Sequence, residues 1–124
     1  MSHESLPAEL RDFLVRNIDS IAQLEALLLL RASPEPGWSA GDAAARLYVG
    51  EPDAVEALSH LAAVGLLERS GDRYKYAPQS SELSRAADLL ADSYRHHLIP
   101  ITNLIHAKPR RIRQFADAFK LKKD

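Results

Sequence analysis

The chain has 124 residues, of which 46% are hydrophobic and 27% charged, with no cysteine and a formal net charge of −1. This balance predicts one globular domain with a modest core, and the missing cysteines exclude disulfides, thiolate metal ligands and cysteine nucleophiles. The sequence does not open with a basic stretch followed by an apolar one. Its longest apolar run, Ala26–Leu30, is far shorter than the roughly 20 residues of a membrane span. We therefore expect a cytoplasmic protein that does not bind membranes.

Apolar residues at helical spacing predict a first helix over about residues 6–16 and a second that begins after Ser20. Ser20 and Gln23 form a capping-box pair, the arrangement in which a side-chain oxygen accepts a free N–H of the first helical turn. The stretch 33–37, Ser-Pro-Glu-Pro-Gly, ends the second helix because proline cannot continue its hydrogen bonds.

Ser39 and Asp42 repeat the capping pattern for a third helix. After a break at 49–50, Pro52 lies at the start of a fourth helix, where its missing N–H costs nothing. Gly65 ends that helix as a left-handed cap.

The pattern then changes from helical to strand-like. Residues 66–69 and 73–76 flank the Ser-Gly-Asp stretch 70–72, which predicts a two-stranded hairpin with its tyrosines on one face and Arg73 and Lys75 on the other. We expect helices and hairpin to share one core, formed by Leu24, Leu28, Leu47, Val55, Leu58, Leu61, Leu66 and Tyr74.

After Ser81, apolar residues three and four positions apart predict a long helix, interrupted near His97 because Pro100 follows. This stripe is longer than one small domain needs to cover. We therefore expect part of it to form a homodimer interface through Leu83, Leu90, Tyr94, Leu98 and Ile101.

The segment 108–124 carries seven Lys or Arg against two Asp, a net charge of +5, which leaves −6 for residues 1–107. Ile112, Phe115 and Phe119 recur at helical spacing and predict a basic amphipathic helix. We expect it to pack on the core or on a second subunit. The alternative is that it binds another protein or nucleic acid.

Helix, helix, turn, helix and hairpin follow one another in the order of a winged helix-turn-helix. Residues 39–47 resemble the first helix of that motif, residues 51–65 look like the recognition helix, and 63–76 is similar to the end of that helix and the wing of MarR-like and ArsR-like bacterial regulators. The resemblance covers about residues 18–78, half of the chain. It implies a mainly α fold with a small β-hairpin, a winged helix-turn-helix domain at 18–78 flanked by an N-terminal helix in 1–17, a long helix in 79–107 and the basic segment 108–124.

The resemblance further implies a dimeric transcriptional regulator that binds duplex DNA. In such families the recognition helix enters the major groove and the wing contacts the backbone or minor groove. The groove-facing candidates are then Asp53, Ala54, Glu56, Ala57 and His60. The cationic candidates are Arg69, Arg73 and Lys75 of the wing, for which a solvated strand face is the alternative, together with Arg110, Arg111 and Arg113 of the basic segment.

The charge of the recognition helix favours a second interpretation. Between Gly41 and Glu68 there are five acidic residues against one arginine, a net charge of −4. DNA affinity depends on cations near phosphates, and an acidic helix is repelled by them. A surface formed by Glu51, Asp53 and Glu56 would instead bind a basic protein partner, which would make the chain a winged-helix adaptor without DNA binding.

No pattern in the sequence indicates catalysis, a metal or a cofactor. The serines lack a nucleophile-elbow context and the glycines do not form a phosphate loop. His96 and His97 point about 100° apart on a helix, and no carboxylate pair completes a metal site with His106. Trp38, beside the Pro-Gly stretch, is expected to be a packing anchor, with base stacking as the less favoured role. We therefore expect a binding protein and not an enzyme.

Overall fold

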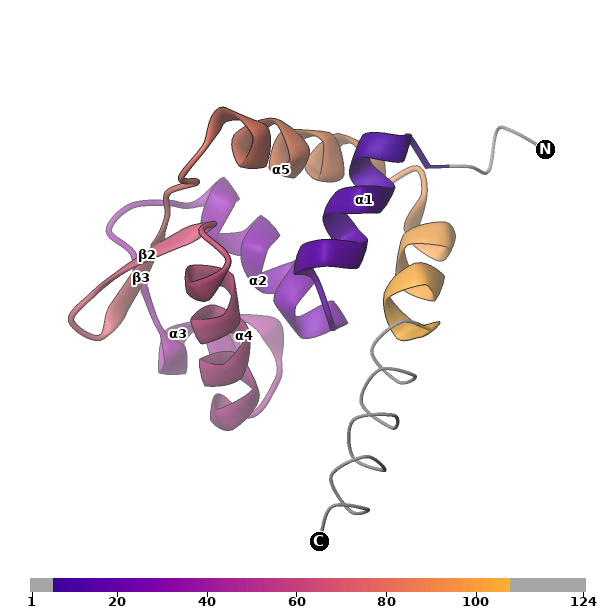
Figure 1. Cartoon of the computed structure of the whole chain (residues 1–124). Coiled ribbons are helices and arrows are strands. Elements are labelled where there is room, and N and C mark those ends of the chain that lie inside the picture. The colour runs from indigo at the N-terminus through magenta and orange to yellow at the C-terminus, as the bar shows by residue number, and fades with distance from the viewer. Residues whose placement is uncertain (1–5, 108–124) are drawn as a thin grey trace, which may run out of the picture.

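The structure is a computed structural model that describes residues 6–107 (Figure 1). It contains the helices α1 (Ala8–Asn17), α2 (Ile21–Ala32), α3 (Ala40–Leu47), α4 (Glu51–Ala63) and α5 (Ser81–Tyr94), and the strands β1 (Trp38–Ser39), β2 (Leu67–Ser70) and β3 (Arg73–Tyr76). Residues 98–107 form a further helix. The prediction of a mainly helical chain with a small β-hairpin is confirmed. The basic segment 108–124, with Arg110, Arg111 and Arg113, lies outside the described residues.

The helix ends follow the local sequence signals. Ser20 Oγ accepts the N–H of Gln23 at 3.1 Å, and Ser39 Oγ accepts the N–H of Asp42 at the same distance, so both predicted caps are confirmed. Gln23 completes its cap differently from an ideal capping box, because its Oε1 accepts the N–H of Asp19, one residue before the cap. Gly65 follows α4 with φ +90°, the left-handed conformation expected there.

The three strands form one antiparallel sheet in the order β1-β3-β2. Ser70 pairs with Arg73, so the hairpin turn consists of two residues, 71–72, and is one residue shorter than predicted. The two-residue strand β1, in which Trp38 pairs with Tyr74, is absent from the sequence prediction. A strand this short shows no alternating pattern, and only its position beside β3 makes it a strand.

The core lies between the helices and the inner face of the sheet, with α4 packed on both α2 and α3, and α5 packed on α1. Five of the eight predicted core residues are buried, namely Leu24, Leu58, Leu61, Leu66 and Tyr74. Leu28 and Leu47 are half-buried at its margin. Val55 is 43% exposed, so its prediction is wrong: the inward face of α4 is formed by the neighbouring positions Ala54, Ala57, Leu58 and Leu61.

The expected break after α5 is confirmed, because a turn at 95–97 separates it from helix 98–107. Leu90 and Ile101 are fully buried within the single chain, so assigning them to a dimer interface was wrong. Leu83 and Tyr94 are half-buried, whereas Leu98 and Ile99 are exposed by 45% and 65%. None of the helices between residues 6 and 107 combines the length and hydropathy of a membrane span.

Candidate functional site

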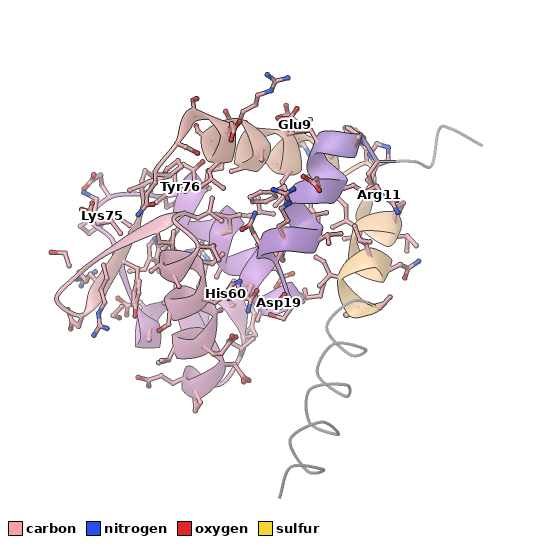
Figure 2. All side chains as sticks on the ribbon, in the orientation of Figure 1. Glu9, Arg11, Asp19, His60, Lys75 and Tyr76 are labelled. Carbon is pink, nitrogen blue, oxygen red and sulfur yellow. The ribbon has the colours of Figure 1, made fainter. Side chains whose placement is uncertain are left out.

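Two cationic side chains of β3 are bound to the loop that precedes β1. Arg73 donates an N–H to the carbonyl oxygen of Gly37 at 2.8 Å, and Lys75 Nζ lies 2.9 Å from Glu35 Oε2. This hydrogen-bonded carboxylate raises the pKa of Lys75. Gly37 has φ +100°, and a Cβ there would lie 3.1 Å from Lys75 Cγ, so this close approach requires a glycine. These two contacts therefore hold the loop before β1 against the hairpin, on which Lys75 is labelled in Figure 2.

The third cation of the hairpin contacts the hairpin itself. Arg69 Nε donates to the carbonyl oxygen of Gly71 at 2.9 Å, and its guanidinium lies 5.7 Å from the ring centroid of Tyr74. Arg69 and Arg73 both remain exposed on the surface. The structure thus places Arg69, Arg73 and Lys75 on one small sheet, and each already has a partner within the chain.

The outward face of α4 differs from the predicted groove-facing set. Glu51 and Asp53 are exposed, but Ala54 and Ala57 are buried, so including these two alanines was wrong. Glu56 accepts hydrogen bonds from the side-chain amide of the fully buried Gln23, at 3.1 and 3.4 Å. The free acidic surface of α4 is therefore smaller than predicted.

His60, another predicted groove-facing residue, is directed toward the junction of α1 and α2 (Figure 2). Its Nε2 lies 2.6 Å from the carbonyl oxygen of Asn17 and 3.9 Å from Asp19 Oδ2. Since a carbonyl oxygen can only accept, Nε2 carries the proton in this bond. His60 therefore links α4 to the first two helices and is half-buried.

The turn between α3 and α4 presents a tyrosine that sequence reasoning missed. Tyr48 ends α3 in the left-handed region, with φ 60° and ψ 44°, and its side chain is 93% exposed. This conformation is uncommon for a bulky residue, and nothing in the local sequence signals it. Tyr48 and Val55 are therefore exposed apolar residues at the turn before α4 and on α4 itself.

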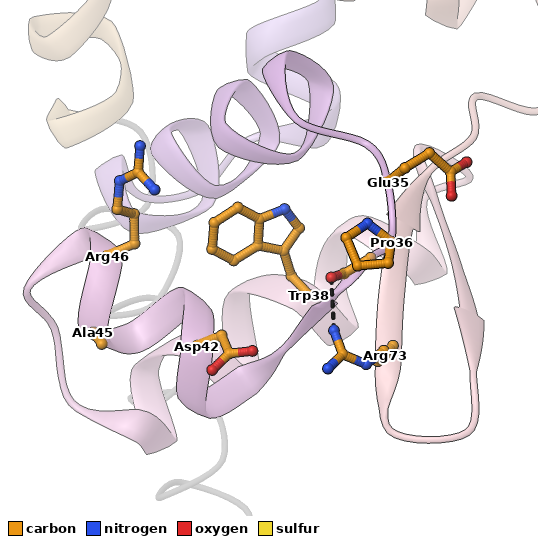
Figure 3. A pocket seen from close by; sticks show the side chains of 8 residues that line it. Glu35, Pro36, Trp38, Asp42, Ala45, Arg46 and Arg73 are labelled. Carbon is orange, nitrogen blue, oxygen red and sulfur yellow. Dashed lines mark hydrogen bonds between the residues drawn. The ribbon is translucent and has the colours of Figure 1, made fainter.

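A surface cavity of about 540 Å³ lies between α3, β3 and the loop before β1 (Figure 3). Trp38 stands in it, with its indole N–H donating to the carbonyl oxygen of Ser33 at 2.8 Å. The Arg46 guanidinium lies 5.9 Å from the centroid of this ring. The lining residues are Glu35, Pro36, Gly37, Trp38, Asp42, Ala45, Arg46 and Arg73.

The described part of the chain, residues 6–107, holds no cluster of three His, Cys, Asp or Glu that could bind a metal. Its nine Lys and Arg are outnumbered by fourteen Asp and Glu, so this part has a net charge of −5. No family model, curated protein or solved structure matches the chain.

Proposed function

We propose that the chain is a winged helix-turn-helix transcriptional regulator of bacterial type that binds duplex DNA as a homodimer in the cytoplasm. The observation that carries this proposal is the order α2-β1-α3-α4-β2-β3 in one compact unit. Helices α3 and α4 are joined by the short turn 48–50 and are followed directly by the β2-β3 hairpin. Strand β1, which lies between α2 and α3 in the sequence, pairs with β3 and completes the sheet. In a winged helix-turn-helix, this arrangement presents the second helix to the major groove and the hairpin to the backbone.

The charges determine how such a domain would hold DNA. Residues 6–107 carry a net charge of −5, and the repulsion from phosphates must be overcome by localised cations. The exposed guanidiniums of Arg69 and Arg73 supply two of them on the hairpin. The segment 108–124, with its net charge of +5, supplies Arg110, Arg111 and Arg113.

The test is binding of the full chain to random-sequence duplex DNA at several salt concentrations. Cations that neutralise phosphates release counterions, so the logarithm of the binding constant should fall linearly with the logarithm of salt concentration. We expect micromolar binding at low salt and a slope of about −4.5 to −5.5, as five or six phosphate contacts would produce. Absence of binding in the micromolar range at low salt would contradict the proposal.

A second candidate function is supported by the exposed surface of α4. Glu51, Asp53 and Val55 are exposed on α4, Val55 by 43%, and Tyr48, which is 93% exposed, ends the helix before it. An acidic surface with an exposed aromatic side chain suits a basic protein partner, because aromatic residues are enriched in protein interfaces. The double variant Glu51→Gln with Asp53→Asn separates the two functions. It should tighten DNA binding in a regulator, and leave an adaptor without measurable DNA binding.

A further inference from the structure

The exposed side of α4 begins with two carboxylates that have no partner in the described chain. Glu51 and Asp53 lie on its first turn, and neither forms an ion pair with a residue between 6 and 107. Helix α4 contains no Lys or Arg, and the last cation before it, Arg46, lies over the ring of Trp38. Negative charge stabilises the N-terminus of a helix, so these carboxylates alone do not define a binding surface.

Between the two carboxylates lies a short apolar strip. Successive residues of an α-helix are about 100° apart, so Glu51 and Asp53 lie on opposite sides of Pro52, and Val55 follows Pro52 within one turn. Both apolar residues are exposed, Val55 by 43%, and neither belongs to the core. We call Glu51, Pro52, Asp53 and Val55 the α4 outer face. It offers apolar contact and negative charge together.

The segment 108–124 has the complementary pattern in its sequence. Its net charge is +5, whereas residues 6–107 carry −5. Ile112, Phe115 and Phe119 are three and four positions apart, so in a helix they share one side, and an arginine stands on either side of Ile112 in the sequence. Opposite charges that flank apolar residues on two surfaces favour the docking of one surface on the other.

We propose that the segment 108–124 docks on the α4 outer face of its own chain. Its apolar residues cover Pro52 and Val55, and its arginines and lysines pair with Glu51 and Asp53. A face of four residues gives a separate partner little binding free energy. A segment of the same chain has an effective concentration in the millimolar range, so a weak contact suffices.

The segment is long enough to make this contact. In Figure 1 the described chain ends apart from α4, so the residues after Ala107 have to cover the separation. Phe115 and Phe119 lie eight and twelve residues beyond Ala107. An extended chain spans about 3.3 Å per residue, or about 26 and 40 Å for these two positions. A domain of about 100 residues has a radius of gyration of about 13 Å, so these lengths are comparable to its diameter.

Docking of the segment also bears on the proposed DNA binding. While the segment occupies the α4 outer face, Arg110, Arg111 and Arg113 are withheld from phosphates and α4 is covered. The docked form therefore binds DNA more weakly than the released form, which makes the contact autoinhibitory. This consequence rests on the proposed function, but the docking itself does not.

Because the chain has no cysteine, a single spin label can be placed in the segment through Gln114→Cys, which at helical spacing lies off the apolar side. The label should broaden the backbone amide NMR signals of Glu51, Asp53 and Val55. Glu51→Gln with Asp53→Asn should weaken docking about two- to thirtyfold, as the loss of two exposed ion pairs predicts, and should reduce the broadening. The matched control, Glu82→Gln with Asp92→Asn, removes the same charge from exposed sites on α5 and should leave the broadening unchanged.

Replacing Arg110, Arg111 and Arg113 by glutamine should weaken docking from the other side without a substitution in residues 6–107. An absence of broadening on α4, or equal broadening in the wild-type protein and the α4 variant, would overturn the proposal. Broadening in a mixture of spin-labelled chains and separate isotope-labelled chains would overturn docking within one chain and identify a second copy as the occupant. Because no DNA is present, failure of this experiment is separate from failure of the proposed function.

Discussion

The side-chain amide of Gln23, which is fully buried on α2, donates hydrogen bonds to both carboxylate oxygens of Glu56 on α4. Glu56 therefore satisfies a buried donor and joins two helices of the core. From sequence alone, Glu56 is one of three equivalent acidic residues on an interaction surface. In the structure only Glu51 and Asp53 are free for that purpose, so a test of surface charge should use these two.

Glu56→Ala should lower the free energy of unfolding by about 1–3 kcal/mol, because the buried Gln23 amide loses its acceptor. Glu56→Gln should cost less, since its amide oxygen still accepts. Glu51→Ala, on the exposed first turn of α4, is the control and should change stability by no more than about 0.5 kcal/mol. Urea denaturation measures all three variants. Equal losses for Glu51→Ala and Glu56→Ala would contradict this role of Glu56.

Leu58→Ala should destabilise the fold by about 2–5 kcal/mol, because Leu58 is fully buried and its truncation leaves a cavity. Val55→Ala, three residues earlier on the same helix, should stay within about 0.5 kcal/mol because Val55 is largely exposed. Thermal melts of the two variants provide the comparison. If the Leu58→Ala protein melted at the same temperature as the wild-type protein, α4 would have to pack through another face.

Replacing Arg73 and Lys75 together by glutamine should weaken DNA binding to a similar extent for all sequences. If both side chains reach phosphates, the slope of the salt dependence should fall by about 2, and if Lys75 stays paired with Glu35 it should fall by about 1. The single variants distinguish these outcomes. Arg11→Gln with Arg95→Gln removes the same charge away from the hairpin and is the control. An unchanged slope in the hairpin variant would exclude the hairpin from the DNA contact.

Alkaline pH should destabilise the fold through three groups. The Glu35 carboxylate raises the pKa of Lys75. Burial raises the pKa of both Tyr76 and Tyr94, and the charge of Asp88 raises that of Tyr76 further. A raised pKa means that the folded state holds the proton more tightly, so this stabilisation is complete below about pH 10 and is lost as pH rises through the raised values. Denaturation at several alkaline pH values should show the decline. The variant Tyr76→Phe should reduce it, and an unchanged decline would contradict the assignment to Tyr76.

Dimerisation, if it uses helix 98–107, should depend on Leu98 and Ile99, because both are exposed whereas Leu90 and Ile101 are buried. Leu98→Glu with Ile99→Glu should shift sedimentation toward the 13.8 kDa monomer, because unpaired charges are costly to bury in an interface. Val55→Glu adds a charge to an exposed site on α4 and should leave the assembly unchanged. A wild-type chain that sediments only as monomer at about 100 µM would contradict a homodimer of micromolar affinity.

The features that could be predicted from sequence are those that neighbouring residues decide. The caps at Ser20 and Ser39 and the glycine after α4 each satisfy backbone groups within a few residues. Which face of α4 packs on the core could not be predicted as well. Alanine fits either a core or a surface, so the sequence does not show that Ala54 is buried and Val55 exposed.

Long-range contacts explain most of what was missed at the candidate site. His60 reaches a carbonyl 43 residues away and Arg73 one 36 residues away, and no spacing in the sequence reveals either bond. The cavity beside Trp38 likewise exists because the loop, α3 and β3 meet. Its aromatic residue could be singled out from the sequence, but its two arginines could not be assigned to it.

The strand order β1-β3-β2 leaves β2 on the outside of the sheet. An outer strand offers unpaired backbone groups to which another chain can add, the usual first step of sheet-mediated aggregation. Here β2 is four residues long and carries exposed Glu68 and Arg69, and short, charged strands resist such addition. This edge of the sheet therefore resists strand addition, and crowding the chain should not convert β2 into a template for fibres.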